Sequence, residues 1–140
     1  MCEALMKKEL TRMGRTDFVA TSAGLNATPD TPAHPWSVAA ARCFDIDLAQ
    51  HKARLLDSDM VDRADVIFAM DIQNQAELLC RYPLARRKLR RLSAFAGKDE
   101  LDEIRDPYHE GEEETKHCYS VLQSCIGNLM IALGLRDTRK

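Results

Sequence analysis

The sequence predicts a single α/β domain in which a short parallel sheet is covered by helices on both faces. Stretches with helical periodicity alternate along the chain with short apolar runs, which is the pattern of strand–helix–strand units. The run 65–70 (DVIFAM) is almost continuously apolar, as expected of a strand buried on both faces. A length of 140 residues suits one domain, assigned here to residues 1–140.

Composition and charge describe a globular protein without an evident polyanionic partner. The chain is 45% hydrophobic and 30% charged, and its net charge is −2, so it has no general attraction to nucleic acid or to an anionic membrane. No apolar run approaches the ~20 residues of a membrane-spanning helix. The opening MCEALMKKEL carries charges where a signal peptide needs an apolar stretch. We therefore expect a cytoplasmic protein with no nucleic-acid or membrane partner.

The cysteines give no metal or disulfide pattern. Five are present, an odd number at wide spacings, and no CxxC or Cys/His zinc motif occurs: Cys2, Cys43, Cys80, Cys118 and Cys125. We expect free thiols in a reducing compartment, with no metal and no cofactor.

The first third of the chain contains two predicted helices and one predicted strand. Residues 1–13 have an amphipathic helical pattern, and Gly14 ends it. Residues 18–23 (FVATSA) predict a short strand, followed by a proline-containing loop over 24–35. The Ala-rich composition of 36–44 favours a helix.

The middle of the chain adds a helix on each side of the apolar strand. Asp57 is placed to cap a helix that runs to Arg63, and Asp71 to cap a helix over 72–80. A further strand is expected at 89–92. It overlaps a basic cluster over 86–91 (RRKLRR), which we interpret as a solvated face.

A long helix is predicted over 112–133 and ends at Gly134. Apolar residues recur along it at helical spacing, and this stripe is expected to face the core: Cys118, Leu122, Cys125, Ile126, Leu129, Met130 and Leu133.

Five segments also resemble one known family, in the same order and at suitable spacings: TSAGL (21–25), TPAHP (31–35), DIDLAQHKARLL (45–56), ADVIFAMD (64–71) and DPY (106–108). Together they are similar to the low-molecular-weight protein-tyrosine phosphatases, whose fold also serves some arsenate reductases. The resemblance runs from Met1 to about Leu133. It implies a three-layer α/β/α fold with a short parallel sheet in the strand order 2-1-3-4.

The family's catalytic loop has the form Cys-x5-Arg-Ser, follows the first strand and leads directly into a helix. The helix at 1–13 resembles the one after that loop, so we expect the first strand and the phosphate loop to be missing from this chain. Cys80 does stand six positions before Arg86. However, Cys80 is expected near a helix C-terminus and no Ser follows Arg86, so we interpret the match as coincidence.

The resemblance gives Asp106 the role of general acid and Tyr108 that of an aromatic that stacks on the phenyl ring of a substrate. From the residues alone, a turn residue is the better interpretation of Asp106 before a proline. For Tyr108, a half-buried tyrosine with a solvated hydroxyl is a close alternative. Where the family often has a second aromatic, this chain has His109.

Ser22 and His51 match residues that support the phosphate loop from beneath. Their alternative interpretations are a cap at a strand end and a surface histidine. Arg54 is expected to contribute packing or surface charge rather than to bind a ligand.

The functional hypothesis is hydrolysis of phosphoric monoesters through a phosphocysteine, acting on a phosphotyrosine protein or a small aryl phosphate, with this chain inactive by itself. One alternative is a non-catalytic binding protein on the same scaffold. Another is an arsenate reductase, with Cys43 and Cys80 as further thiols. Because an interior strand is expected to be missing, we expect a marginally stable monomer, a rearranged sheet, or a strand-exchanged oligomer in which a partner fills the gap.

Overall fold

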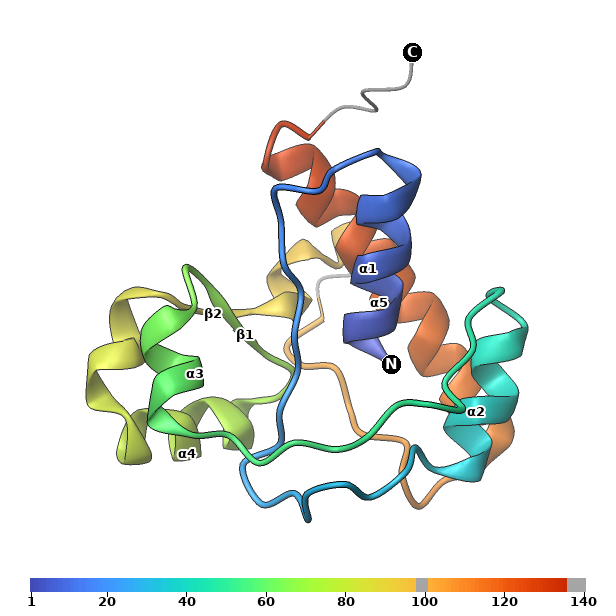
Figure 1. The fold of residues 1–140 in the computed structure, drawn as a ribbon, viewed down its shortest axis with the longest axis horizontal. Helices are drawn as coiled ribbons and strands as arrows, with labels where there is room; N and C mark the ends of the chain where they lie inside the picture. Colours follow the sequence, from blue (N-terminus) through green and yellow to red (C-terminus); the bar gives the residue numbers. More distant parts are fainter. Residues whose placement is uncertain (98–100, 136–140) are drawn as a thin grey trace.

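The computed structural model describes residues 1–97 and 101–135. Five α-helices, two strands and two 3-10 helices alternate along them (Figure 1), namely α1 (Cys2–Arg12), α2 (Pro35–Arg42), α3 (Ser58–Arg63), β1 (Ile67–Ala69), α4 (Ile72–Arg81), η1 (Pro83–Arg87), β2 (Leu89–Arg91), η2 (Leu92–Phe95) and α5 (Glu112–Ala132). The predicted α/β class is confirmed. No helix among these residues is both long and apolar enough to cross a membrane.

The sheet consists of β1 and β2, which pair in parallel with Ile67 opposite Leu89 and Ala69 opposite Arg91. Both strands were expected from the sequence, at 65–70 and 89–92. Each is three residues long, shorter than expected, because the parallel ladder covers only these positions.

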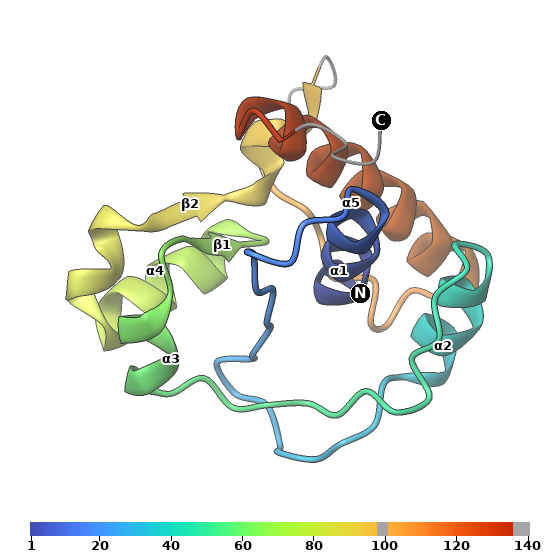
Figure 2. The same cartoon turned by 45° about the horizontal axis from the view of Figure 1, so that its top comes forward.

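The core forms two apolar clusters, one on each side of β1. Phe68 and Met70 pack against a larger cluster built from α1, α2 and α5, whereas Ile67 and Ala69 belong to a smaller cluster with α3 and α4. Figure 2 shows the two groups of helices on opposite sides of the molecule. Because side chains alternate along a strand, β1 contributes to both clusters.

Local capping interactions match the sequence pattern. The Asp57 carboxylate accepts a hydrogen bond from the Met60 amide at 2.8 Å, and Asp71 accepts one from the Asn74 amide at 2.6 Å. Gly14 has φ +68° and follows α1 in a left-handed conformation, so that the Arg15 amide reaches back to the Leu10 carbonyl. This is the Schellman ending that glycine permits at low cost.

The predicted apolar stripe of α5 is buried except at its last member. Leu133 is 51% exposed, which corrects the expectation for this residue. The helix ends in a second Schellman turn at Gly134, in which the Leu135 amide donates to the Met130 carbonyl. That turn packs Leu135 against the core, as is usual for the apolar residue after such an ending.

The strand predicted at 18–23 does not form. Residues 16–23 are extended, but none of their backbone groups takes part in a backbone hydrogen bond within the described residues. The first sheet-like contact comes after them, as a parallel bridge between Gly24 and Leu55. Val19 is 89% exposed and Phe18 39% exposed. A strand needs a neighbouring backbone to pair with, and the described residues place none beside this segment.

Truncation of the α5 stripe should destabilise the protein strongly. Ile126 is fully buried, so Ile126→Ala is expected to lower the free energy of unfolding by about 2–5 kcal/mol. Ile131→Ala removes the same atoms from a 76% exposed position on the same helix and should change it by less than ~0.5 kcal/mol. Urea denaturation followed by circular dichroism measures both. Equal effects would mean that α5 does not pack as described.

Candidate active site

The beginning of α1 is the point where three distant segments meet. Glu3 lies in the first turn of this helix, and its carboxylate accepts a hydrogen bond from Ser22 Oγ at 2.5 Å and one from Arg54 Nη2 at 2.8 Å. Lys7, one turn further along α1, pairs with the other carboxylate oxygen. Glu3 therefore connects α1 to the extended segment 16–23 and to the segment that carries Arg54.

The Glu3 carboxylate is buried and charged. Its side chain is only 6% exposed. Burial by itself would raise the pKa of Glu3, but hydrogen bonds from Lys7, Ser22 and Arg54 outweigh that effect and lower it to about 2. A buried carboxylate is tolerated where such donors surround it, so this charge depends on all three partners.

His51 lies near the same charges. It is half-buried, and burial lowers the pKa of its imidazole, which the positive charges of Arg54 and Lys7 lower further and Glu3 raises. The structure thus brings Ser22 and His51 to one region, at the start of α1. Sequence reasoning assigned both to this region but missed Glu3, and it treated Arg54 as surface charge.

Asp106 lies on a separate loop that faces the first turns of α5. Its side chain is exposed, and Oδ1 accepts a hydrogen bond from the Tyr108 amide at 3.0 Å, which closes a tight turn. On α5, burial raises the pKa of the Cys118 thiol to about 11, and the nearby negative charge of Asp106 raises it as well. Burial also raises the pKa of Cys2, at the start of α1, and the neighbouring Cys118 raises it further. Asp106 and the start of α1 therefore both lie close enough to Cys118 to affect its thiol.

Tyr108 belongs to an aromatic cluster formed by His34, Trp36, Tyr108 and His109. The ring of Tyr108 meets the rings of His34 and His109 edge-on, with 4.9 Å between ring centroids in each pair. The ring centroids of His34 and Trp36 are 4.8 Å apart. His34 is held in place because its Nδ1 accepts the Trp36 amide at the start of α2. Tyr108 is 54% exposed, so part of this residue is accessible to a ligand.

The exposed thiols lie at the C-terminal ends of helices, which is not where a phosphate-binding loop places its cysteine. Cys80 is exposed in the last turn of α4, where the helix presents carbonyl oxygens, and Arg86 lies in η1. A thiolate that attacks a phosphate needs amide groups around it. Cys43 is also exposed, at the end of α2. Among residues 1–97 and 101–135, no three His, Cys, Asp or Glu side chains are grouped to hold a metal.

Removal of the Glu3 charge should weaken the fold in a pH-dependent way. Because the pKa of Glu3 lies below its unfolded value of ~4.5, its stabilisation is present above pH ~4.5 and is lost as the pH falls toward 2. Glu3→Gln is expected to cost about 1–3 kcal/mol at pH 7 and less near pH 2. Glu9→Gln, which loses a surface pair with Arg12, should cost ~0.5 kcal/mol or less.

Thermal or urea unfolding between pH 2 and 7 measures this difference. If Glu3→Gln and the wild-type chain differed by the same amount at every pH, Glu3 would not be the charged group described above.

Comparison with known proteins places the chain in one family. The model of the "Low molecular weight phosphotyrosine protein phosphatase" family matches residues 1–139. The chain is 32% identical over 108 residues to "Probable low molecular weight protein-tyrosine-phosphatase EpsP" of Ralstonia nicotianae, which covers 77% of this chain and 72% of that protein.

Two solved structures agree with this result. A protein tyrosine phosphatase from Entamoeba histolytica, crystallised with Hepes in the active site, superposes with a TM-score of 0.87 at 27% identity, covering 95% of this chain and 86% of the other. The low molecular weight protein tyrosine phosphatase of T. tengcongensis gives a TM-score of 0.85 at 26% identity, covering 94% and 88%. The chain belongs to the low molecular weight phosphotyrosine protein phosphatase family.

Proposed function

We propose that this chain provides the acid loop and the ring-binding surface of a cytoplasmic enzyme that hydrolyses phosphotyrosine in proteins or small aryl phosphates. The observation that carries the proposal is the placement of Asp106 and Tyr108 on one loop near the start of α1 in a member of this family. Family membership supplies the reaction class. The loop supplies a carboxyl group for the general acid, Asp106, and an aromatic ring, Tyr108.

The proposed reaction has two steps and needs no cofactor. A cysteine thiolate attacks phosphorus, the S–P bond forms, and the P–O bond to the phenol breaks as Asp106 gives its proton to the leaving oxygen. Water then attacks phosphorus, Asp106 takes a proton from it, and the P–S bond breaks to release phosphate. The ring of Tyr108 lies against the phenyl ring of the substrate.

In this proposal Ser22 and His51 support the phosphate-binding segment, and Glu3 holds Ser22 in position. Glu3 accepts the Ser22 hydroxyl. That bond uses the O–H of Ser22, so both lone pairs of Ser22 Oγ stay free to accept a hydrogen bond from a neighbouring backbone amide.

We propose that the 140 residues by themselves do not hydrolyse phosphate esters. Their sequence contains no Cys-x5-Arg-Ser, and Cys80 with Arg86 lies at the wrong end of a helix. A chain without the nucleophile and its amide cradle lacks both the covalent route and the stabilisation of transition-state charge. A non-catalytic binding protein remains the second candidate, since Ser22 and Arg54 both donate hydrogen bonds to Glu3 and so have a role in the fold itself.

The purified 140-residue chain should not turn over p-nitrophenyl phosphate above the buffer rate, and Asp106→Asn should leave that rate unchanged. Turnover that Asp106→Asn abolishes would contradict the proposed inactivity. The coding DNA upstream of Met1 separates the two candidates, because an in-frame Cys-x5-Arg-Ser there supports the enzyme and a stop codon supports the binding protein. In a chain that includes such a segment, Asp106→Asn should lower kcat by about 10²–10⁴-fold.

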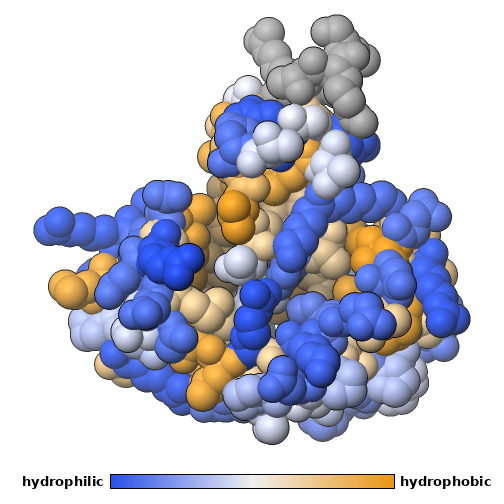
Figure 3. Space-filling view, viewed as in Figure 1, coloured by the Kyte–Doolittle hydropathy of each residue, from blue (hydrophilic) through white to orange (hydrophobic). Residues whose placement is uncertain are grey.

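We also propose that a second copy of the chain supplies a strand to the open side of the sheet. Within the part of the chain that the structure describes, residues 16–23 are extended without backbone partners, and β1 pairs through one edge only, with β2. Phe18, Val19 and Val66 are exposed apolar side chains of this region. Figure 3 shows apolar side chains at the surface between the two halves of the molecule. Unpaired strand edges of this kind recruit further strands.

Sedimentation velocity at increasing protein concentration tests the strand exchange. The wild-type chain should form dimers, and Val19→Asp should shift the equilibrium to monomer by at least tenfold. Leu84→Asp is the matched control, because Leu84 is also 89% exposed but lies in η1, away from this edge. A monomeric wild type, or equal effects of the two substitutions, would contradict the proposal.

A further inference from the structure

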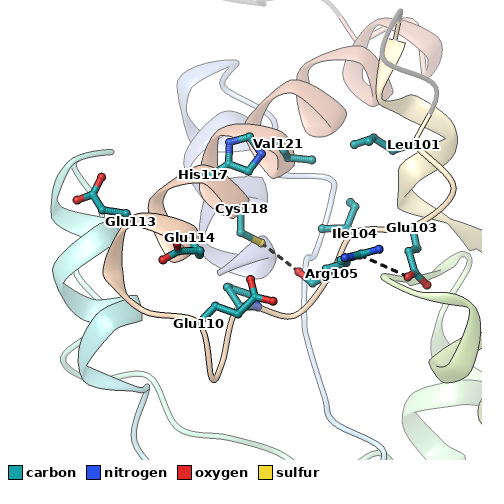
Figure 4. A pocket seen from close by; sticks show the side chains of 11 residues that line it. Leu101, Glu103, Ile104, Arg105, Glu110, Glu113, Glu114, His117, Cys118 and Val121 are labelled. Atoms are coloured by element: carbon teal, nitrogen blue, oxygen red, sulfur yellow. Dashed lines mark hydrogen bonds and ion pairs between the residues drawn. The ribbon is translucent and has the colours of Figure 1, made fainter.

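A groove with an apolar floor and an acidic rim lies between the segment 101–110 and the first turns of α5 (Figure 4). Its volume is about 520 Å³, large enough for one or two amino-acid side chains. Ile104, Pro107 and Cys118 are buried and form the floor together with the half-buried Val121. None of the candidate site residues Asp106, Tyr108, Ser22 and His51 lines this groove.

The charges around the groove are predominantly negative. Four glutamates line it, against one arginine and one histidine. Glu103 pairs weakly with Arg105 at 3.9 Å, and Glu113 pairs with Lys116 at 2.9 Å. Within the described residues Glu110 and Glu114 have no ion pair, and Figure 4 shows both beside Cys118 at the groove. The rim thus offers two uncompensated carboxylates above an apolar floor.

The groove is continuous with the loop of the candidate active site. Arg105 and Pro107 line it, and Asp106 stands between them in the chain. Tyr108, which carries the proposed ring-binding surface, follows directly. A peptide bound at Tyr108 advances about 3.3 Å per residue, so residues a few positions from its phosphotyrosine reach the groove.

We propose that this groove binds a Lys or Arg side chain of the peptide segment that flanks the phosphotyrosine in a substrate protein. That the occupant belongs to a substrate peptide rests on the proposed function. The aliphatic stem of Lys or Arg packs on the floor while its charged end reaches Glu110 and Glu114, an arrangement that suits these two side chains in particular. An acidic or purely apolar peptide would instead leave these carboxylates desolvated without a partner.

The test uses an unphosphorylated, fluorescein-labelled peptide, Gly-Ala-Arg-Leu-Arg-Ala-Gly, and fluorescence anisotropy with the 140-residue chain. Binding is expected, and it should weaken at least tenfold in the Glu110→Gln/Glu114→Gln double variant and between 50 and 500 mM NaCl. The same peptide with Glu in place of Arg should not bind. Val121→Lys, which places a positive charge in the groove, should weaken binding in the same direction.

Glu112→Gln is the matched control, because Glu112 lies on the same helix turn and pairs with Lys116 but does not line the groove. It should change the affinity less than twofold. Equal binding of the Arg and Glu peptides, or unchanged binding in the double variant, would overturn the inference. Because the peptide carries no phosphate, this result is independent of the phosphatase proposal, which the p-nitrophenyl phosphate and DNA measurements test.

Discussion

A buried carboxylate at the start of α1 organises the region on which the proposed chemistry depends. Glu3 accepts hydrogen bonds from Ser22 and Arg54, which stand 19 and 51 positions away in the chain. Removing a charge from water costs several kcal/mol unless donors replace the lost hydration, and here Lys7 is a third donor. The carboxylate therefore favours the one arrangement of segments in which its donors are present together. Since residues 16–23 form no backbone hydrogen bonds with the other residues that the structure describes, the hydrogen bond of the Ser22 hydroxyl is an important link between this segment and α1.

The thin sheet explains why side-chain contacts of this kind matter. β1 and β2 pair over three residues each, so the backbone ladder contributes few hydrogen bonds. The larger apolar cluster forms where α1 and α2 pack against α5, and the smaller one forms around α3 and α4. β1 lies between them and contributes alternate side chains to both. The two clusters are therefore joined through β1, and side-chain contacts add to the few backbone hydrogen bonds of the sheet.

What the sequence predicts well is what neighbouring residues determine. The caps at Asp57 and Asp71, the ending at Gly14 and most of the α5 stripe each depend on residues within about four positions, and all were expected. The strand at 18–23 was wrong because pairing requires a distant backbone. Glu3 was missed for a similar reason, since helical periodicity places it away from the apolar side and its burial comes from Ser22 and Arg54. For Asp106 and Tyr108, local pattern alone did not distinguish a turn from a catalytic loop. Resemblance to a family favoured the catalytic loop. The hydrogen bond from the Tyr108 amide to Asp106 is local and would occur in an ordinary turn as well, whereas the contact of Tyr108 with His34 depends on the fold.

The acid loop and the Glu3 site are held by different contacts, and this separation bears on how a complete site would assemble. The Tyr108 amide restrains Asp106, the His34 ring restrains Tyr108, and the start of α2 restrains His34. None of these contacts involves Glu3, Ser22 or Arg54. The position of Asp106 therefore does not depend on the hydrogen bonds around Glu3. Conversely, the hydrogen bonds from Ser22 and Arg54 to Glu3 involve no residue of the loop that carries Asp106. A substitution at Glu3 thus removes none of the contacts that hold Asp106 and Tyr108, and a substitution in that loop removes none of the donors on which the buried charge of Glu3 depends.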